Sequence, residues 1–153
     1  MMNFLRYPML ALSARLLVGG VILYAGLSKI GDPSAMSGVI ENYRLLPAGL
    51  VNPVAIVLPG VEIATGFCLV AGLLVKGSRL IATALLVLFL AAILWAISQG
   101  LDIECGCFGT SDAERVGWTA LTRDCFMLLL LSPVWFTQQH LLALDTWLLN
   151  QRR

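Results

Sequence analysis

The chain has 153 residues, of which 59% are hydrophobic and 12% charged, and its mean hydropathy is +0.87. This balance excludes an ordinary water-soluble domain and indicates a lipid bilayer as the surroundings. The formal net charge is only +1, and we expect no nucleic-acid partner.

Four segments are long and apolar enough to cross a bilayer, which takes roughly 20 residues. We predict helices at residues 7–30, 51–75, 79–99 and 116–138. A cleaved signal peptide is the alternative for the first segment, but that segment is too long, contains Arg15 and lacks a small-residue cleavage site. The predicted fold is all-α, a four-helix transmembrane bundle forming one domain over residues 1–153.

The orientation of the bundle follows from the basic residues, because lysine and arginine are retained on the cytoplasmic side. One side of the predicted membrane carries five of them: Arg6, Lys76, Arg79, Arg152 and Arg153. The other side carries Arg44 and Arg115 among six carboxylates: Asp32, Glu41, Asp102, Glu104, Asp112 and Glu114. We therefore predict a bacterial inner-membrane protein with cytoplasmic termini and a periplasmic third loop, where disulfides can persist.

The first outer loop, "GDPSAMSGVIENYRLLP", predicts a short interfacial helix. Asp32 can cap a helix whose first position is Pro33. Four apolar residues then recur at helical spacing on one face: Met36, Val39, Ile40 and Tyr43. We expect this helix to lie flat at the membrane surface.

The loop before the fourth span holds two cysteines, Cys105 and Cys107, in "ECGCFG". Ser111 and Glu114 fit a capping box, which places the cysteines just ahead of a helix N-terminus. That N-terminus and Arg115 favour a thiolate, whereas the neighbouring carboxylates Asp102 and Glu104 oppose it. Gly106 gives the backbone freedom that a tight ring needs, and closing a disulfide across one residue should make it exchangeable.

Two other uses of this cysteine pair stay open, a structural bridge and half of a soft-metal site. The single histidine, His140, lies at the far end of the fourth helix. We therefore expect no intramolecular zinc site, although copper shared with a partner remains an alternative. Cys68 and Cys125 fall within helices and are predicted to be small buried core residues.

Ionisable residues inside the predicted spans form a second set, because a charge in hydrocarbon is usually paired or functional. They are Arg15, Glu62, Arg123 and Asp124. We predict buried ion pairs in which Glu62 is paired with one of the arginines, since two arginines and two carboxylates can neutralise one another. The alternative is a polar pocket that relays protons or holds a quinone, with Arg15, Glu62 and Arg123 as the candidate cofactor-binding residues. Lys29 is expected to extend to the outer interface.

The order of several motifs resembles a known family. The chain contains "ARLLVGGVILYAGLSKIGDP", "ENYRLLP", "LPGVEIATGFCLVAGL", "CGCFGTS" and "VGWTALTRD". In this order they resemble the DoxX-like membrane proteins, specifically the MauE branch of methylamine utilisation. The resemblance implies a four-helix inner-membrane protein, a periplasmic thioredoxin-like partner and disulfide formation in a secreted enzyme subunit. It also implies that Cys105 and Cys107 carry the redox motif.

The sequence thus predicts a membrane thiol–disulfide exchange protein that trades a disulfide with a thioredoxin-like partner or a disulfide-rich client. A noncatalytic scaffold that recruits a soluble periplasmic enzyme is one alternative. A quinone-linked oxidoreductase subunit is another, since DoxX relatives are linked to thiosulfate oxidation with quinone as acceptor. Membrane oxidases of the vitamin K epoxide reductase and DsbB type are also similar in outline, but they use a CxxC pair where this chain has CxC.

Overall fold

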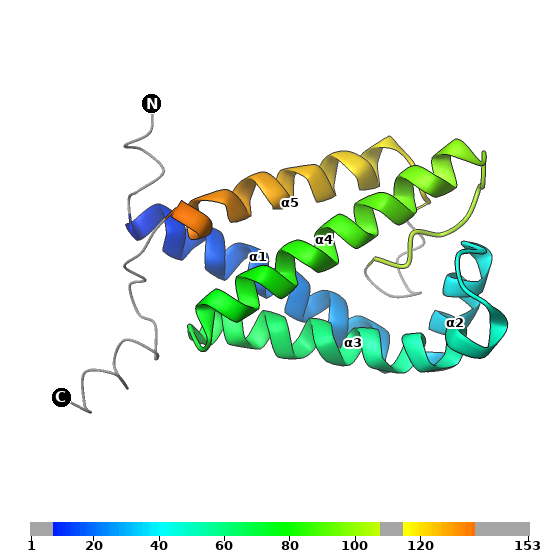
Figure 1. The fold of residues 1–153 in the computed structure, drawn as a ribbon, viewed down its shortest axis with the longest axis horizontal. Coiled ribbons are helices and arrows are strands. Elements are labelled where there is room, and N and C mark those ends of the chain that lie inside the picture. The colour runs from blue at the N-terminus through cyan, green and yellow to red at the C-terminus, as the bar shows by residue number, and fades with distance from the viewer. Residues whose placement is uncertain (1–7, 108–114, 137–153) are drawn as a thin grey trace.

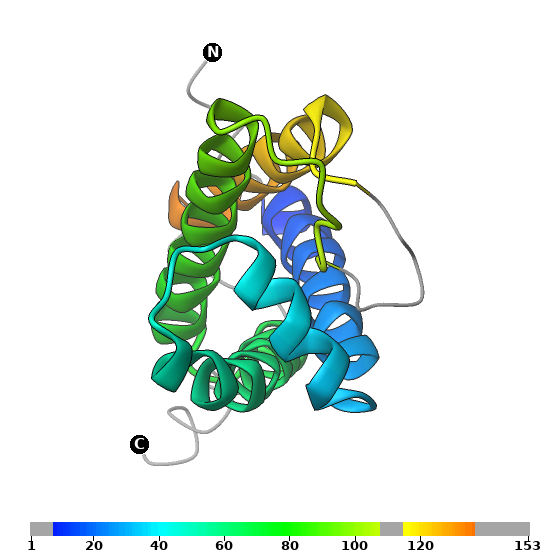
Figure 2. The same ribbon diagram turned by 90° about the vertical axis from the view of Figure 1, so that its right-hand side faces the viewer.

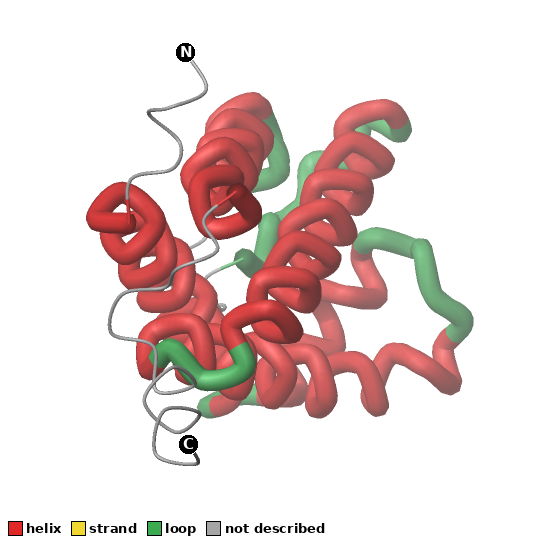
Figure 3. The backbone as a smooth tube through the Cα atoms, turned by 60° about the vertical axis from the view of Figure 1, so that its left-hand side comes forward, coloured by secondary structure: helices red, strands yellow, loops and turns green. Residues whose placement is uncertain are grey.

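The computed structural model describes residues 8–107 and 115–136, and over these residues it consists of helices and their connections, without a named strand (Figure 3). The helices are α1 (Pro8–Ile30), α2 (Pro33–Asn42), α3 (Ala48–Ala71), α4 (Val75–Ser98) and α5 (Trp118–Phe136). Four of them, α1, α3, α4 and α5, are long and apolar enough to cross a membrane. The predicted four-helix transmembrane bundle is confirmed, while the single domain over 1–153 stays a prediction.

The long helices bury a common apolar core and leave many other apolar side chains on the outside. The core includes Val18 of α1, Leu69 of α3, Leu86 of α4 and Leu131 of α5. Several large apolar residues on the outer faces are more than half exposed, for example Leu129. Such surfaces suit a bilayer, since lipid tails are as apolar as the side chains themselves.

Helices α1 and α3 approach each other closely because small residues line their contact. A Cβ atom built on Gly66 would lie 2.5 Å from the backbone nitrogen of Leu23 and 2.7 Å from the carbonyl oxygen of Gly19. No side chain larger than hydrogen fits there without moving one helix. Small residues are the usual means by which membrane helices pack backbone to backbone.

The boundary between the second and third spans differs from the prediction. The apolar pattern continues to Val75, but α3 ends at Ala71 and α4 begins at Val75. Gly72 adopts a left-handed conformation, with φ of 70°, and caps α3, as glycine commonly does. Leu74 follows with φ of 45°. Hydropathy could not locate this turn, because its residues are as apolar as the helices on either side.

The short helix α2 forms as predicted and is capped by Asp32. The Asp32 carboxylate accepts hydrogen bonds from the Ser34 hydroxyl at 2.6 Å and from the Ala35 backbone N–H at 2.9 Å. These bonds lower the pKa of Asp32, the Ser34 bond most strongly. The apolar face of α2 packs on the protein, where Val39 and Tyr43 form a buried cluster with Ala96 of α4.

The arrangement of α2, α3 and α4 positions the site. Helices α3 and α4 meet at the turn near Gly72 and diverge toward their other ends (Figure 1). Viewed from that wide end, α2 lies across the bundle, beside the loop that leaves α4 (Figure 2). This loop contains Cys105 and Cys107.

Candidate functional site

Cys105 and Cys107 form a disulfide in the connection between α4 and α5. Their Cα atoms are 5.3 Å apart, and a single residue separates them. Cys105 is buried, with 6% of its surface exposed, and packs beside Ile93 and Ala120, whereas Cys107 is half-buried. The two cysteines are therefore unequally exposed.

The segments before and after the disulfide loop are joined to each other by backbone and side-chain contacts. Ile103 accepts a backbone hydrogen bond from Val116 at 2.9 Å, and Glu104 and Arg115 form an isolated antiparallel bridge. The Arg115 guanidinium also pairs with the Asp102 carboxylate at the surface. Arg115, which was predicted to assist the cysteines, thus has a carboxylate partner of its own. The predicted capping residues Ser111 and Glu114 lie outside the described residues.

Helix α2 covers the loop from the other side. The Tyr43 hydroxyl donates a hydrogen bond to the carbonyl oxygen of Cys105 at 3.0 Å. Burial and, to a smaller extent, the charge of Asp124 raise the pKa of Tyr43 to about 12, while Arg123 acts in the opposite direction. Gly106 has φ of +66°, and a Cβ atom there would lie 2.5 Å from Cγ1 of Val39. Both its conformation and its contact with α2 therefore require glycine.

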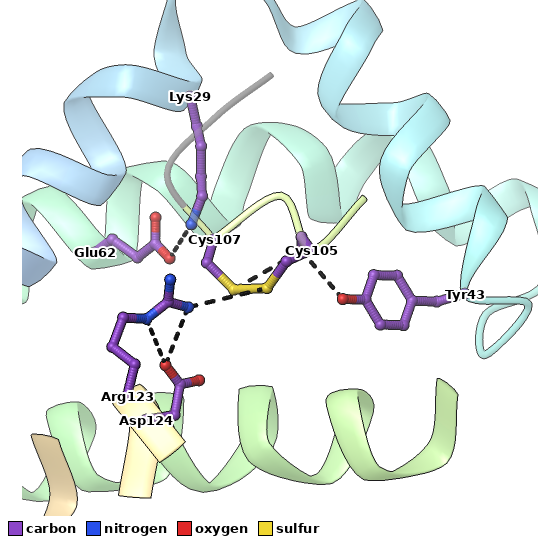
Figure 4. The surroundings of a disulfide bond; sticks show 7 residues. All are labelled: Lys29, Tyr43, Glu62, Cys105, Cys107, Arg123 and Asp124. Atoms are coloured by element: carbon purple, nitrogen blue, oxygen red, sulfur yellow. Dashed lines mark hydrogen bonds and ion pairs between the residues drawn. A yellow bond between two sulfur atoms is a disulfide. The ribbon is translucent and has the colours of Figure 1, made fainter. Parts of the chain in front are cut away.

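Arg123 of α5 brings a positive charge to the disulfide (Figure 4). Its Nη2 atom lies 4.0 Å from the sulfur of Cys105. The same guanidinium donates through Nε and Nη2 to Oδ1 of Asp124, with both distances 3.2 Å. Asp124 is buried and fixes the position of the guanidinium. A cation beside a sulfur favours the thiolate, so this contact favours Cys105 as the sulfur that would carry negative charge if the bond opened.

A buried ion pair lies beside Cys107, on the same side of the disulfide as Arg123 (Figure 4). Lys29 of α1 donates to Oε1 of Glu62 of α3 at 2.6 Å, and each side chain is 1% exposed. The ammonium also lies 5.0 Å from the centre of the Phe89 ring. The expectation that Lys29 extends to the interface is wrong, because the Glu62 carboxylate draws it inward.

The predicted partners of Glu62 need a matching correction. Glu62 pairs with Lys29 and not with an arginine, and Arg123 pairs with the adjacent Asp124. Arg15 is buried in α1, 14 residues before Lys29 and therefore about 21 Å away along the helix axis. Of the three candidate cofactor-binding residues, the structure brings Glu62 and Arg123 together near the disulfide and leaves Arg15 apart.

Two cavities border the disulfide. A small one of about 40 Å³ is lined by Glu62, Cys107, Arg123 and Asp124 together with apolar residues, and it is large enough for a water molecule. Within the described part of the chain, Oε2 of Glu62 is buried and has no hydrogen-bond partner. The other cavity measures about 560 Å³, lies between α2, α3 and α4, and has Cys105, Gly106 and Cys107 in its wall.

The remaining cysteines are not part of this arrangement. Cys68 in α3 is half-buried and Cys125 in α5 is exposed, and both are free thiols. The prediction that Cys125 is a buried core residue is therefore wrong. In a spanning helix the lipid-facing side is as apolar as the core side, so composition did not distinguish them.

Sequence reasoning overlooked Tyr43 and Lys29 as parts of the site. Tyr43 was recognised only as a member of an apolar helix face. Its hydroxyl was the available signal, because a buried tyrosine hydroxyl usually finds a hydrogen-bond partner. For Lys29, the available signal was the Glu62 carboxylate in the next span, which needs a positively charged partner inside the membrane.

The chain is similar to known proteins over most of its length. The family model described as methylamine utilisation protein MauE matches residues 7–136. A methylamine utilization protein MauE of Paracoccus denitrificans is 34% identical over 125 residues, covering 81% of this chain and 67% of the relative. One from Methylorubrum extorquens is 28% identical over 129 residues, covering 84% and 69%. One from Methylophilus methylotrophus is 36% identical over 101 residues, covering 65% and 53%.

No solved structure matches the chain. The wider link to DoxX-like proteins stays a prediction. The matches to two of the MauE relatives each cover more than four fifths of this chain. The four spanning helices lie within the matched residues 7–136. The chain is a multi-pass membrane protein and belongs to the MauE family.

Proposed function

We propose that this protein is a membrane thiol–disulfide exchange protein of methylamine utilisation. In this proposal, Cys105 and Cys107 pass their disulfide to a periplasmic thioredoxin-like partner or to a disulfide-rich client. The observation that carries the proposal is the asymmetry of the pair. Arg123 lies against the buried Cys105 sulfur, while Cys107 is the more exposed cysteine.

This asymmetry sets the direction of the exchange step. A thiolate of the incoming protein attacks the sulfur of Cys107 and forms a mixed disulfide with it. The Cys105–Cys107 bond breaks, and its electron pair stays on the sulfur of Cys105, where the Arg123 guanidinium stabilises the thiolate. A second thiolate of the incoming protein then attacks its own sulfur in the mixed disulfide. Cys107 leaves as a thiolate, and the incoming protein carries the new disulfide.

A purely structural bridge would contribute little at this position. In the chain-entropy description, a loop of three residues gains only about 1.6 kcal/mol from cross-linking, against about 3 kcal/mol for a loop of 15 residues. The loop is also held by the Val116 hydrogen bond and the Tyr43 hydroxyl. These contacts position the loop without help from the disulfide, which supports a chemical use of the pair.

The proposed location of the exchange is the periplasmic face of the inner membrane. The disulfide loop lies at the end of the bundle that carries Asp32, Glu41 and Asp102, whereas Lys76 and Arg79 lie at the other end. Basic residues are retained in the cytoplasm, which supports a periplasmic disulfide loop and cytoplasmic termini.

A redox titration of the purified protein separates exchange from a noncatalytic scaffold. The Cys68→Ser/Cys125→Ser variant leaves only the Cys105–Cys107 couple to measure. For an exchange protein we expect a potential within the range of disulfide catalysts, roughly −120 to −270 mV. A potential below about −300 mV, typical of structural disulfides, would instead support a scaffold in which the pair is a bridge.

A further inference from the structure

The larger cavity beside the disulfide has an almost entirely apolar lining. Its lining includes Met36 of α2, Tyr43 directly after α2, Val54 of α3 and Trp95 of α4, together with both cysteines of the pair. Its volume of about 560 Å³ is within the range of about 300 to 1,000 Å³ that is usual for small-molecule sites. A molecule in this cavity would therefore lie against the loop that holds the disulfide.

The cavity continues into a groove between α3 and α4. This groove measures about 620 Å³ and shares Val54, Leu58 and Leu88 with the cavity. It extends along α4 as far as Leu80, whose side chain is 58% exposed. From Trp95 to Leu80 the distance along the helix is about 22 Å, since each residue adds 1.5 Å. The continuous apolar path suits a compact head group with a long hydrocarbon tail.

We propose that this cavity and groove bind an isoprenoid quinone of the membrane, with its ring against Cys105 and Cys107 and its tail between α3 and α4. The inference rests on the proposed exchange function. An acyl chain would also fit an apolar groove, but it cannot accept electrons from a dithiol. The presence of the cysteine pair in the wall therefore favours a redox-active lipid. Tyr43 adds the hydroxyl of this wall, which is otherwise almost entirely apolar.

The reaction regenerates the disulfide after each exchange. The reduced pair gives two electrons and its two thiol protons to the two ring oxygens of the quinone. A sulfur–sulfur bond forms between Cys105 and Cys107, and the quinone leaves as a quinol. In this scheme the incoming protein approaches the disulfide loop from the solvent side, and the quinone binds on the cavity side.

The test uses the reduced protein in detergent without oxygen, with ubiquinone-1 as the probe. We expect one quinol to form for each pair of thiols lost. Ala91→Phe places a ring in the cavity at an exposed position of α4 and should slow this reaction about tenfold or more by occluding the site. Ala64→Phe is the matched control, because Ala64 is an exposed alanine of α3 outside both the cavity and the groove.

Binding is measured separately through the fluorescence of Trp95. Ubiquinone-1 should quench it in the Cys105→Ser/Cys107→Ser variant, and Ala91→Phe should abolish this quenching while Ala64→Phe retains it. Quenching without any exchange of the wild-type pair with a dithiol client would overturn the proposed function alone. Exchange without quinol formation, or with phospholipid as the bound molecule, would overturn the quinone site alone. Equal rates for Ala91→Phe and wild type would also overturn it.

Discussion

Lys29 of α1 and Glu62 of α3 form an ion pair that is almost completely excluded from solvent, with 2.6 Å between Nζ and Oε1. The pair joins the two helices that also approach through Gly66, and it lies beside the disulfide loop (Figure 4). Breaking it would leave a buried charge without its counter-ion, which is strongly unfavourable. The position of these helices and the surroundings of Cys107 therefore depend on the same contact.

The first prediction concerns Glu62→Gln. The substitution keeps the shape of the side chain but leaves the Lys29 ammonium without a carboxylate, which should cost about 3 to 5 kcal/mol. We expect less folded protein in the membrane and a lower midpoint of thermal unfolding. Glu41→Gln is the control, because Glu41 is exposed on α2. Equal amounts of the two variants would show that Glu62 is not a structural partner.

The second prediction concerns the cation beside Cys105. In the reduced Cys107→Ser background, Arg123→Gln should slow alkylation of Cys105 by iodoacetamide at neutral pH, because less of the thiol is ionised without the guanidinium. Arg123→Lys should restore part of the rate. Arg115→Gln should not change it, since Arg115 pairs with Asp102 at the surface. An unchanged rate in Arg123→Gln would remove the electrostatic basis of the proposed exchange direction.

The third prediction concerns ionisation of Tyr43. Titration followed by the absorbance of tyrosinate should contain a component with a midpoint at about 12, and Tyr43→Phe should remove it. The unfolded chain ionises nearer pH 10, so the contribution of Tyr43 to stability is complete below about pH 10 and is lost as the pH rises toward 12. A midpoint near 10 for this tyrosine would contradict its burial against Cys105.

Much of the architecture was predictable because it depends on local pattern. The four spans follow from apolar length, and the start of α2 follows from Asp32 ahead of Pro33. The approach of Cys105 and Cys107 follows from their spacing of two residues. These features need no knowledge of which helices are neighbours.

The ion-pair partners that are distant in sequence were not predictable, because hydropathy does not distinguish the core-facing side of a spanning helix from its lipid-facing side. Lys29 and Glu62 are 33 residues apart, and only the packing of α1 on α3 brings them together. Arg123 lies near Cys105 because α5 begins beside the disulfide loop. The sequence alone was equally compatible with an ion pair between Arg123 and Glu62. The cavity depends on the divergence of α3 and α4, for which the turn near Gly72 gave no signal in the hydropathy.

The fourth prediction concerns topology. In the Cys68→Ser/Cys125→Ser background, a membrane-impermeant maleimide added to intact, reduced cells should label the Cys105–Cys107 pair. A single cysteine introduced by Lys76→Cys, in a variant lacking the other four, should react only after lysis, because Lys76 lies at the opposite end of the bundle. The reverse pattern would place the disulfide loop in the cytoplasm.

The last prediction tests the exchange itself, by trapping the mixed disulfide. Cys105→Ser leaves Cys107, the more exposed cysteine, without the neighbour that would release it. This variant should accumulate a covalent adduct with the periplasmic partner, visible on a non-reducing gel and lost with reductant. Cys107→Ser should accumulate less, because Cys105 is buried.

The controls for this trap are the two free cysteines. Cys68→Ser and Cys125→Ser should each leave the adduct unchanged when combined with Cys105→Ser. Maturation of the client in the Cys105→Ser/Cys107→Ser variant is the most direct measurement of the central claim. The exchange function predicts that maturation is lost in this variant, whereas full maturation without either cysteine would contradict it.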